Sequence, residues 1–229
     1  MTNYSKERLL NNIDYLLKIK NIKISELENY MGVSVGYLSR LKNSDNPESC
    51  PSIDSLSKIA EKLDSSIISL LFCNYAELTE TELYLINKIE KIIDKTKDGL
   101  IKWERIKQHD FVNYDYDINE IYEDYYNSSK VTKSLFLDQY VTVHNDVYYF
   151  NTKDKEYLLI PISFKKNVQY EFYLVVNERF CKRILCSQNG GKSGIFEIMD
   201  NLYKIAEFSS KQVKIDKEVK ESLDDLFSD

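Results

Sequence analysis

The segment at residues 34–43 gathers side chains that can bond to nucleic-acid bases and phosphates. At helical spacing, Leu38 and Leu41 face inward and Arg40 faces outward. The Arg40 guanidinium can donate two parallel hydrogen bonds to one guanine, and the Lys42 ammonium is attracted to phosphates. The spacing therefore predicts a short helix with one polar, partly basic face.

A second stretch, residues 110–126, combines carboxylates with tyrosines and contains no lysine or arginine. Spaced carboxylates can substitute for phosphates, and tyrosine rings offer stacking surface. The stretch is either a docking surface for a basic partner or, more simply, a solvated edge whose tyrosines pack on a sheet. The carboxylates that a partner would meet are Asp115, Asp117, Glu120, Glu123 and Asp124.

Patterns for catalysis or metal binding are weaker. Residues 186–193 (CSQNGGKS) resemble the end of a phosphate-binding loop, but Cys186 stands where the first glycine belongs. Cys181 and Cys186, taken with His109 or His144, match no zinc spacing well. We therefore expect no metal, no cofactor and no enzymatic activity.

The segment 34–43 needs a small helical core to hold it. Apolar spacing predicts helices at residues 6–20, 25–31, 34–43, 52–63 and 66–71. Gly32 suits the tight turn before the third helix, and Ser34 and Ser52 suit N-caps of the third and fourth. The fourth helix is expected to bury Ile53, Leu56, Ile59, Ala60 and Leu63.

The rest of the chain changes from helix to strand. Thr79 and Glu82 have capping-box spacing at the start of a helix over residues 79–98, and Trp103 is expected to pack that helix against a sheet. Runs rich in Val, Ile, Tyr and Phe predict strands at residues 139–144, 147–151, 156–164, 169–177 and 180–186. The connectors are short, which favours an antiparallel meander. Two helices follow, at residues 195–209 and 216–227.

These patterns predict an α+β chain with two domains. Residues 1–74 form a five-helix domain, and residues 75–229 form a domain with an antiparallel sheet flanked by helices. The second domain is expected to serve dimerisation, sensing or partner binding.

Residues 6–72 resemble the Cro/repressor-type (xenobiotic-response-element) helix-turn-helix family. The resemblance rests on LENYMGVSVGYLSRLKN at residues 27–43 and on SIDSLSKIAEKLDSSIISLLF at residues 52–72. Two positions depart from the family pattern: Ile24 replaces a frequent glutamine, and Glu28 replaces a small residue. The resemblance implies a double-stranded DNA operator, contacted by Ser34, Val35, Gly36, Tyr37, Ser39, Arg40, Lys42 and Asn43. Tyr37 could instead complete the core, and Ser34 and Asn43 would meet phosphates.

Charge and hydropathy limit the possible partners. The 229 residues carry a net charge of −6, which excludes a chain-wide basic coat for non-specific nucleic-acid binding. Residues 1–75 hold nine of the 31 basic and nine of the 37 acidic residues, so the excess negative charge lies in the remainder. No apolar run is long enough for a membrane helix, and no signal segment opens the chain. We expect a cytoplasmic protein with free thiols.

Two main functions fit this sequence, and a third, weaker possibility is the antidote half of a toxin pair. The first is a dimeric, sequence-specific transcriptional regulator, a repressor of phage or mobile-element type that reads the major groove with residues 34–43. The second is a protein-binding inhibitor, similar to anti-CRISPR proteins. Its helix-turn-helix would autoregulate its promoter, and its acidic, tyrosine-rich second domain would block a nucleic-acid enzyme.

Overall fold

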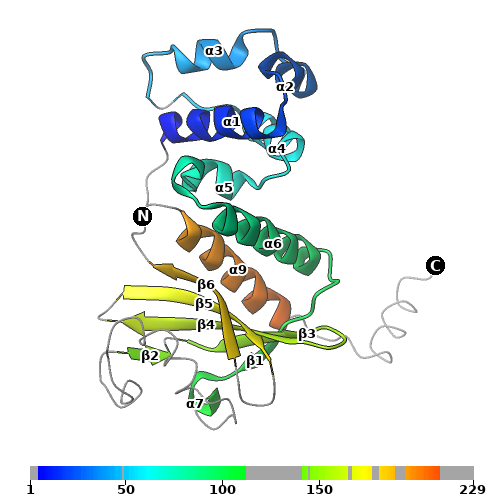
Figure 1. Cartoon of the computed structure of the whole chain (residues 1–229), viewed down its shortest axis with the longest axis vertical. Helices are drawn as coiled ribbons and strands as arrows, with labels where there is room; N and C mark the ends of the chain where they lie inside the picture. Colours follow the sequence, from blue (N-terminus) through cyan, green and yellow to red (C-terminus); the bar gives the residue numbers. More distant parts are fainter. Residues whose placement is uncertain are drawn as a thin grey trace, which may run out of the picture.

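The computed structural model describes residues 5–47, 49–111, 141–143, 145–164, 167–176, 181–188 and 194–211. These residues form three layers in Figure 1: short helices at the top, α6 and α9 in the middle, and an antiparallel sheet below. α6 (Glu80–Lys97) packs against α9 (Ile195–Ser210), and α9 packs on the sheet. The α+β fold expected from the sequence is confirmed.

The first layer consists of short helices that share one core. They are α1 (Lys6–Lys20), α2 (Ile24–Met31), α3 (Tyr37–Lys42), α4 (Ile53–Lys62) and α5 (Ile67–Phe72). Serines cap three of them: the hydroxyls of Ser5, Ser52 and Ser66 each accept a hydrogen bond from the backbone N–H three residues later. The inward residues include Leu9, Ile13, Leu27, Ile59 and Leu63, which are almost completely buried. The helical spacing therefore predicted this core well.

A 3-10 helix, η1 (Tyr75–Glu77), leads into α6, which begins with a complete capping box. Thr79 Oγ1 accepts from Glu82 N at 3.2 Å, and Glu82 Oε2 accepts from Thr79 N at 2.8 Å. After α6, the Trp103 Nε1–H donates to Thr96 Oγ1 at 3.0 Å. The Trp103 ring also meets the Phe150 ring edge-on, with centroids 4.7 Å apart. Trp103 thus joins α6 to the sheet, as its position in the sequence predicted.

The sheet is an antiparallel meander. Its strand order is β1-β3-β4-β5-β6, and β2 pairs with the same edge of β4 as β3 does, further along the strand. The strands are β1 (Glu104–Ile106), β2 (Val141–Val143), β3 (Val147–Asn151), β4 (Glu156–Phe164), β5 (Asn167–Val175) and β6 (Cys181–Gln188). A short helix, α7 (Gln108–Phe111), follows β1. Short connectors between β3, β4 and β5 leave room only for antiparallel pairing.

One hydrophobic core runs from α1 to the sheet without interruption. On the sheet it contains stacked rings of Phe150, Tyr157 and Phe172, with neighbouring centroids 4.9 and 5.8 Å apart. The Tyr170 ring of β5 contacts the Tyr203 ring of α9, with centroids 5.1 Å apart. Aromatic contacts of this kind stabilise a packed face beyond their buried area.

Close contacts hold the end of α5 against α1 and against the start of α9. The Asn12 amide on α1 donates to Leu70 O and Cys73 O at 2.9 and 2.7 Å, and it accepts from Tyr75 N at 3.2 Å. Gly194, at the start of α9, lies directly against the backbone of Phe72 and Cys73. The end of α5 is therefore clamped between α1 and α9.

Several expectations need correction. The third helix begins at Tyr37, and its N-cap is Gly36 rather than Ser34. Ile53 is 78% exposed and does not join the buried stripe, because it occupies the first turn of α4 at the surface. β1 was not predicted, since three residues give no readable alternation. The expected helix at 216–227 lies outside the described residues, as do residues 139, 140 and 144 of the first expected strand and residues 177 and 180 of the last two.

Replacing Gly194 by alanine is expected to destabilise the protein by about 2–5 kcal/mol. The new Cβ would lie 2.2 Å from Phe72 O, and Gly194 has a left-handed φ of 74°. Gly99→Ala is the matched control, because Gly99 has a φ of 72° and nothing within 4 Å of its added Cβ. Denaturant unfolding should show the larger loss for Gly194. Equal losses would mean that the contact between α5 and α9 adds nothing.

Candidate nucleic-acid interface

Two left-handed glycines shape the turn between α2 and α3. Gly32 ends α2 with φ 74°, and Gly36 precedes α3 with φ 81°. Between them the chain makes one tight turn, in which Tyr37 N donates to Ser34 O at 3.0 Å. Glycine adopts this backbone conformation without the Cβ clash that other residues suffer. The turn therefore sets the direction in which α3 leaves α2.

A buried carboxylate caps α3 from the neighbouring helix. Glu28 of α2 is 1% exposed, and its Oε2 accepts from Gly36 N at 2.8 Å while Oε1 accepts from Leu38 N at 2.9 Å. These amides belong to the first turn of α3, where helix geometry supplies no acceptor. The negative charge also suits the positive end of the helix dipole. Sequence reasoning noted Glu28 only as a departure from the family pattern. The sequence feature that could have indicated this cap is the position of Glu28, eight residues before Gly36 and ten before Leu38.

The residues of the turn and of α3 divide between core and surface, and of the proposed DNA contacts only Gly36 and Tyr37 are partly buried. Leu38 is buried, and Tyr37 and Leu41 are partly buried and pack on the core. Gly36 is also partly buried. The exposed residues are Ser34, Val35, Ser39, Arg40, Lys42 and Asn43. These six side chains form the outward surface of the turn and of α3, which we call the α3 face.

The Arg40 guanidinium folds back over the turn. Its NH2 donates to Ser34 Oγ at 2.5 Å, and its NH1 donates to Val35 O at 3.1 Å. A guanidinium carries five N–H donors, so three stay available for a base or a phosphate. The Ser34 hydroxyl, which was expected to meet a phosphate, here holds Arg40 in place.

Two lysines fix α3 and the loop after it to α1. Lys42 Nζ lies 2.9 Å from Asp14 Oδ2, at the surface, where such a pair contributes at most about 1 kcal/mol. Lys6 Nζ donates to Ser44 O at 2.5 Å and to Asn46 O at 3.0 Å. The Lys6 contacts were not predicted, because they join residues 38 and 40 positions apart.

Two features of the described residues bear on metal binding and on nucleophilic catalysis. Among those residues, no three His, Cys, Asp or Glu side chains gather in a way that could hold a metal ion. Burial raises the pKa of the Cys73 thiol to about 12, and burial together with the Glu171 charge raises the pKa of Cys186 to about 12. Both thiols are therefore protonated at neutral pH, and a protonated thiol is a poor nucleophile.

The proposed partner-binding carboxylates cannot be placed. Asp115, Asp117, Glu120, Glu123 and Asp124 lie outside the described residues.

Replacing Glu28 by glutamine should loosen the start of α3. The amide keeps one acceptor oxygen, but its NH2 group faces a backbone N–H, so we expect a loss of about 1–3 kcal/mol in stability. Hydrogen exchange at the Gly36 and Leu38 amides should accelerate more than exchange elsewhere in α3.

Glu26→Gln is the matched control for this change, because Glu26 lies exposed on the same helix. It should alter stability by no more than about 0.5 kcal/mol. Unchanged protection of both amides in Glu28→Gln would contradict the capping role.

Among the described helices, none is long and apolar enough to cross a membrane. A family model described as helix-turn-helix matches residues 13–70, from α1 to α5. No curated protein and no solved structure matched the chain. The match includes Glu28 and the whole α3 face. Residues 13–70 therefore form a helix-turn-helix domain of the Cro/repressor type, as the sequence predicts.

Proposed function

We propose that this protein is a sequence-specific transcriptional regulator, a repressor that reads the DNA major groove with α3. The observation that carries the proposal is the exposed α3 face, held by the Glu28 cap within a helix-turn-helix domain. A major groove is wide enough to admit one α-helix, and such a helix presents its first residues to the base edges.

Each side chain of the α3 face suits a different part of DNA. The Arg40 guanidinium can donate to the O6 and N7 of guanine through donors that Ser34 and Val35 leave available. The Val35 side chain is 69% exposed and suits contact with a thymine methyl group. Lys42 and Asn43 at the end of α3 suit phosphates, which position a protein without reading sequence.

A dimer would give this small surface the affinity it needs. α3 has six residues, and the domain around it is electrically neutral, so one copy makes few phosphate contacts. Two copies related by a twofold axis would read half-sites about 34 Å apart, one helical turn of DNA. The second half of the chain is the part that we propose to hold the two copies together. Bound across a promoter, such a dimer would block transcription without catalysing a reaction.

The alternative, inhibition of a nucleic-acid enzyme by the acidic stretch, stays a prediction. The carboxylates on which it depends lie outside the described residues.

Arg40→Ala is expected to weaken binding to the operator by about 1–3 kcal/mol and to relax specificity at one base pair. The measurement is a mobility shift of the full-length protein on the DNA upstream of its own gene, at two salt concentrations.

Lys95→Ala is the control for lost charge, because Lys95 is exposed in the last turn of α6, away from the α3 face. It should leave operator binding unchanged. Wild-type binding that shows no preference over random DNA would refute the proposal. Operator binding that Arg40→Ala leaves intact would instead remove Arg40 from the interface.

A further inference from the structure

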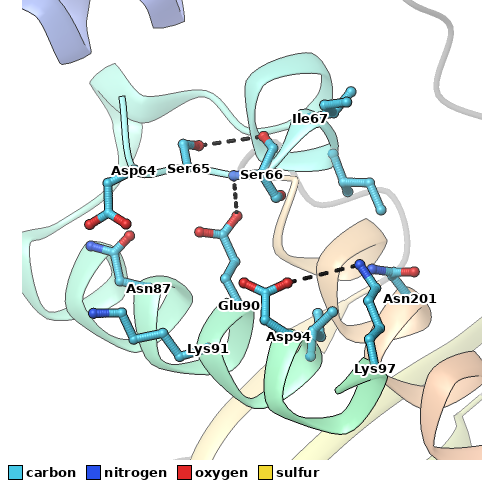
Figure 2. A pocket seen from close by; sticks show the side chains of 12 residues that line it. Asp64, Ser65, Ser66, Ile67, Asn87, Glu90, Lys91, Asp94, Lys97 and Asn201 are labelled. Atoms are coloured by element: carbon cyan, nitrogen blue, oxygen red, sulfur yellow. Dashed lines mark hydrogen bonds and ion pairs between the residues drawn. The ribbon is translucent and has the colours of Figure 1, made fainter. Parts of the chain in front are cut away.

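A cleft lies where the helix-turn-helix domain meets α6 and α9. Its volume is about 300 Å³, which is at the lower end of the range for small-molecule sites. One wall is the turn at residues 64–68 between α4 and α5, and the other is α6, with Asn201 of α9 closing one end (Figure 2). A ligand in this cleft would touch both halves of the chain.

Glu90 is the most buried charged side chain of the cleft, at 7% exposed. Its Oε1 accepts from Ser66 N at 3.0 Å and also from the Ser69 hydroxyl, so this oxygen caps the start of α5. Among the described residues, none donates a hydrogen bond to the second oxygen, Oε2. Figure 2 shows that this oxygen points away from Ser66, into the space beside Asn87. The Glu90 carboxylate thus bonds to the helix-turn-helix domain through Oε1 and faces the cleft with Oε2.

Carboxylates near Glu90 favour a cation in the cleft. Asp94 and Asp64 add two exposed carboxylates at its opening, where each has one long ion pair at 3.9 Å, Asp94 with Lys97 and Asp64 with Lys20. Lys91 and Lys97 are exposed, so their ammonium groups lie at the rim. Asn87, Glu90, Lys91, Asp94 and Lys97 follow one stripe of α6, because helical residues three and four apart share a face.

The remaining lining of the cleft is aliphatic. Ile67 and Ile68 contribute from α5, and Ile93 contributes from α6. Among the described residues that line the cleft, none is aromatic, so they offer a flat ligand no ring to stack on. An extended aliphatic body of a few carbon atoms fits both the volume and this lining.

We propose that the cleft binds a small aliphatic ligand through a primary ammonium group, which pairs with Glu90 Oε2 and Asp94. The ammonium supplies three donors to carboxylates that have acceptor capacity left, and charge-assisted hydrogen bonds of this kind are strong. The aliphatic body lies against Ile67 and Ile93. This site does not depend on whether the α3 face binds DNA.

Ligand binding would stabilise the docking of the helix-turn-helix domain on α6. The ligand bridges the turn at residues 64–68 and α6, so it binds the docked arrangement better than any arrangement in which the two separate. A ligand with such a preference shifts the equilibrium toward the docked state. If the orientation of α3 affects operator affinity, the ligand and the operator are coupled, and each changes the affinity for the other by the same factor.

Amino acids and diamines both carry a primary ammonium group, and variants of the cleft can distinguish the two. An amino acid would place its ammonium at Glu90 and its carboxylate near Lys91 or Lys97. A diamine would place its second ammonium near Asp64. Binding that weakens in Lys91→Gln and Lys97→Gln therefore indicates an amino acid, and binding that weakens in Asp64→Asn indicates a diamine.

The test is isothermal titration of the full-length protein with L-leucine and with putrescine. Isocaproate and butanediol serve as analogues that lack the ammonium groups. We expect saturable binding of at least one amine and none of the analogues. Glu90→Gln should weaken that binding about 10–100-fold.

Because Glu90→Gln also disturbs the cap of α5, Asp94→Asn provides a second variant that leaves this cap intact, and it should weaken binding as well. Asp98→Asn is the matched control, since Asp98 ends α6 outside the cleft. The proposal is wrong if neither amine binds, if the analogues bind equally well, or if Glu90→Gln and Asp94→Asn bind as tightly as Asp98→Asn.

Discussion

The helical half of this protein depends on carboxylates that cap the helices next to them. α3 and α5 have six residues each, and the backbone N–H groups of their first turn have no acceptor within the helix. Glu28 of α2 accepts from two backbone amides at the start of α3, and Glu90 of α6 accepts from Ser66 N and from the Ser69 hydroxyl at the start of α5. Isolated helices of this length are unstable in water. The helical conformation of α3 and α5 therefore depends on contacts with the neighbouring helices.

This dependence links the nucleic-acid face to the rest of the molecule. The Glu28 cap sets where α3 begins, and the contacts of Asn12, Glu90 and Gly194 hold α5 against α1, α6 and α9. One continuous core joins these elements, so α6 and the helix-turn-helix domain share packed side chains. In such an arrangement the second half of the chain can influence how α3 is presented.

The Arg40 guanidinium is hydrogen-bonded to the turn but remains exposed at the surface. Its bonds to Ser34 and Val35 restrict the guanidinium in the protein as it stands. Both bonds lie at the exposed surface, where water can replace them at small cost. The side chain can therefore be repositioned toward a base without leaving a buried group unpaired.

Much of the local structure could be predicted from the sequence, because its causes lie within a few residues. Apolar spacing indicated α1 and α4, the Thr79–Glu82 pair indicated the start of α6, and short connectors indicated the antiparallel meander. The errors occurred where distant residues compete with a local signal. Ser34 has the side chain of an N-cap, but Glu28 reaches the amides of the first turn of α3 and moves the start of the helix to Tyr37.

The sequence by itself determined the helix-turn-helix domain and the antiparallel pairing of the strands joined by short connectors, since spacing and turn chemistry act locally. The tertiary structure alone decided which carboxylate caps which helix, where the Arg40 guanidinium rests and how α5 meets α9. It also placed Glu90 between a helix cap and a cleft. These features join residues far apart in the chain, and only the packing of the whole core brings them within hydrogen-bond distance.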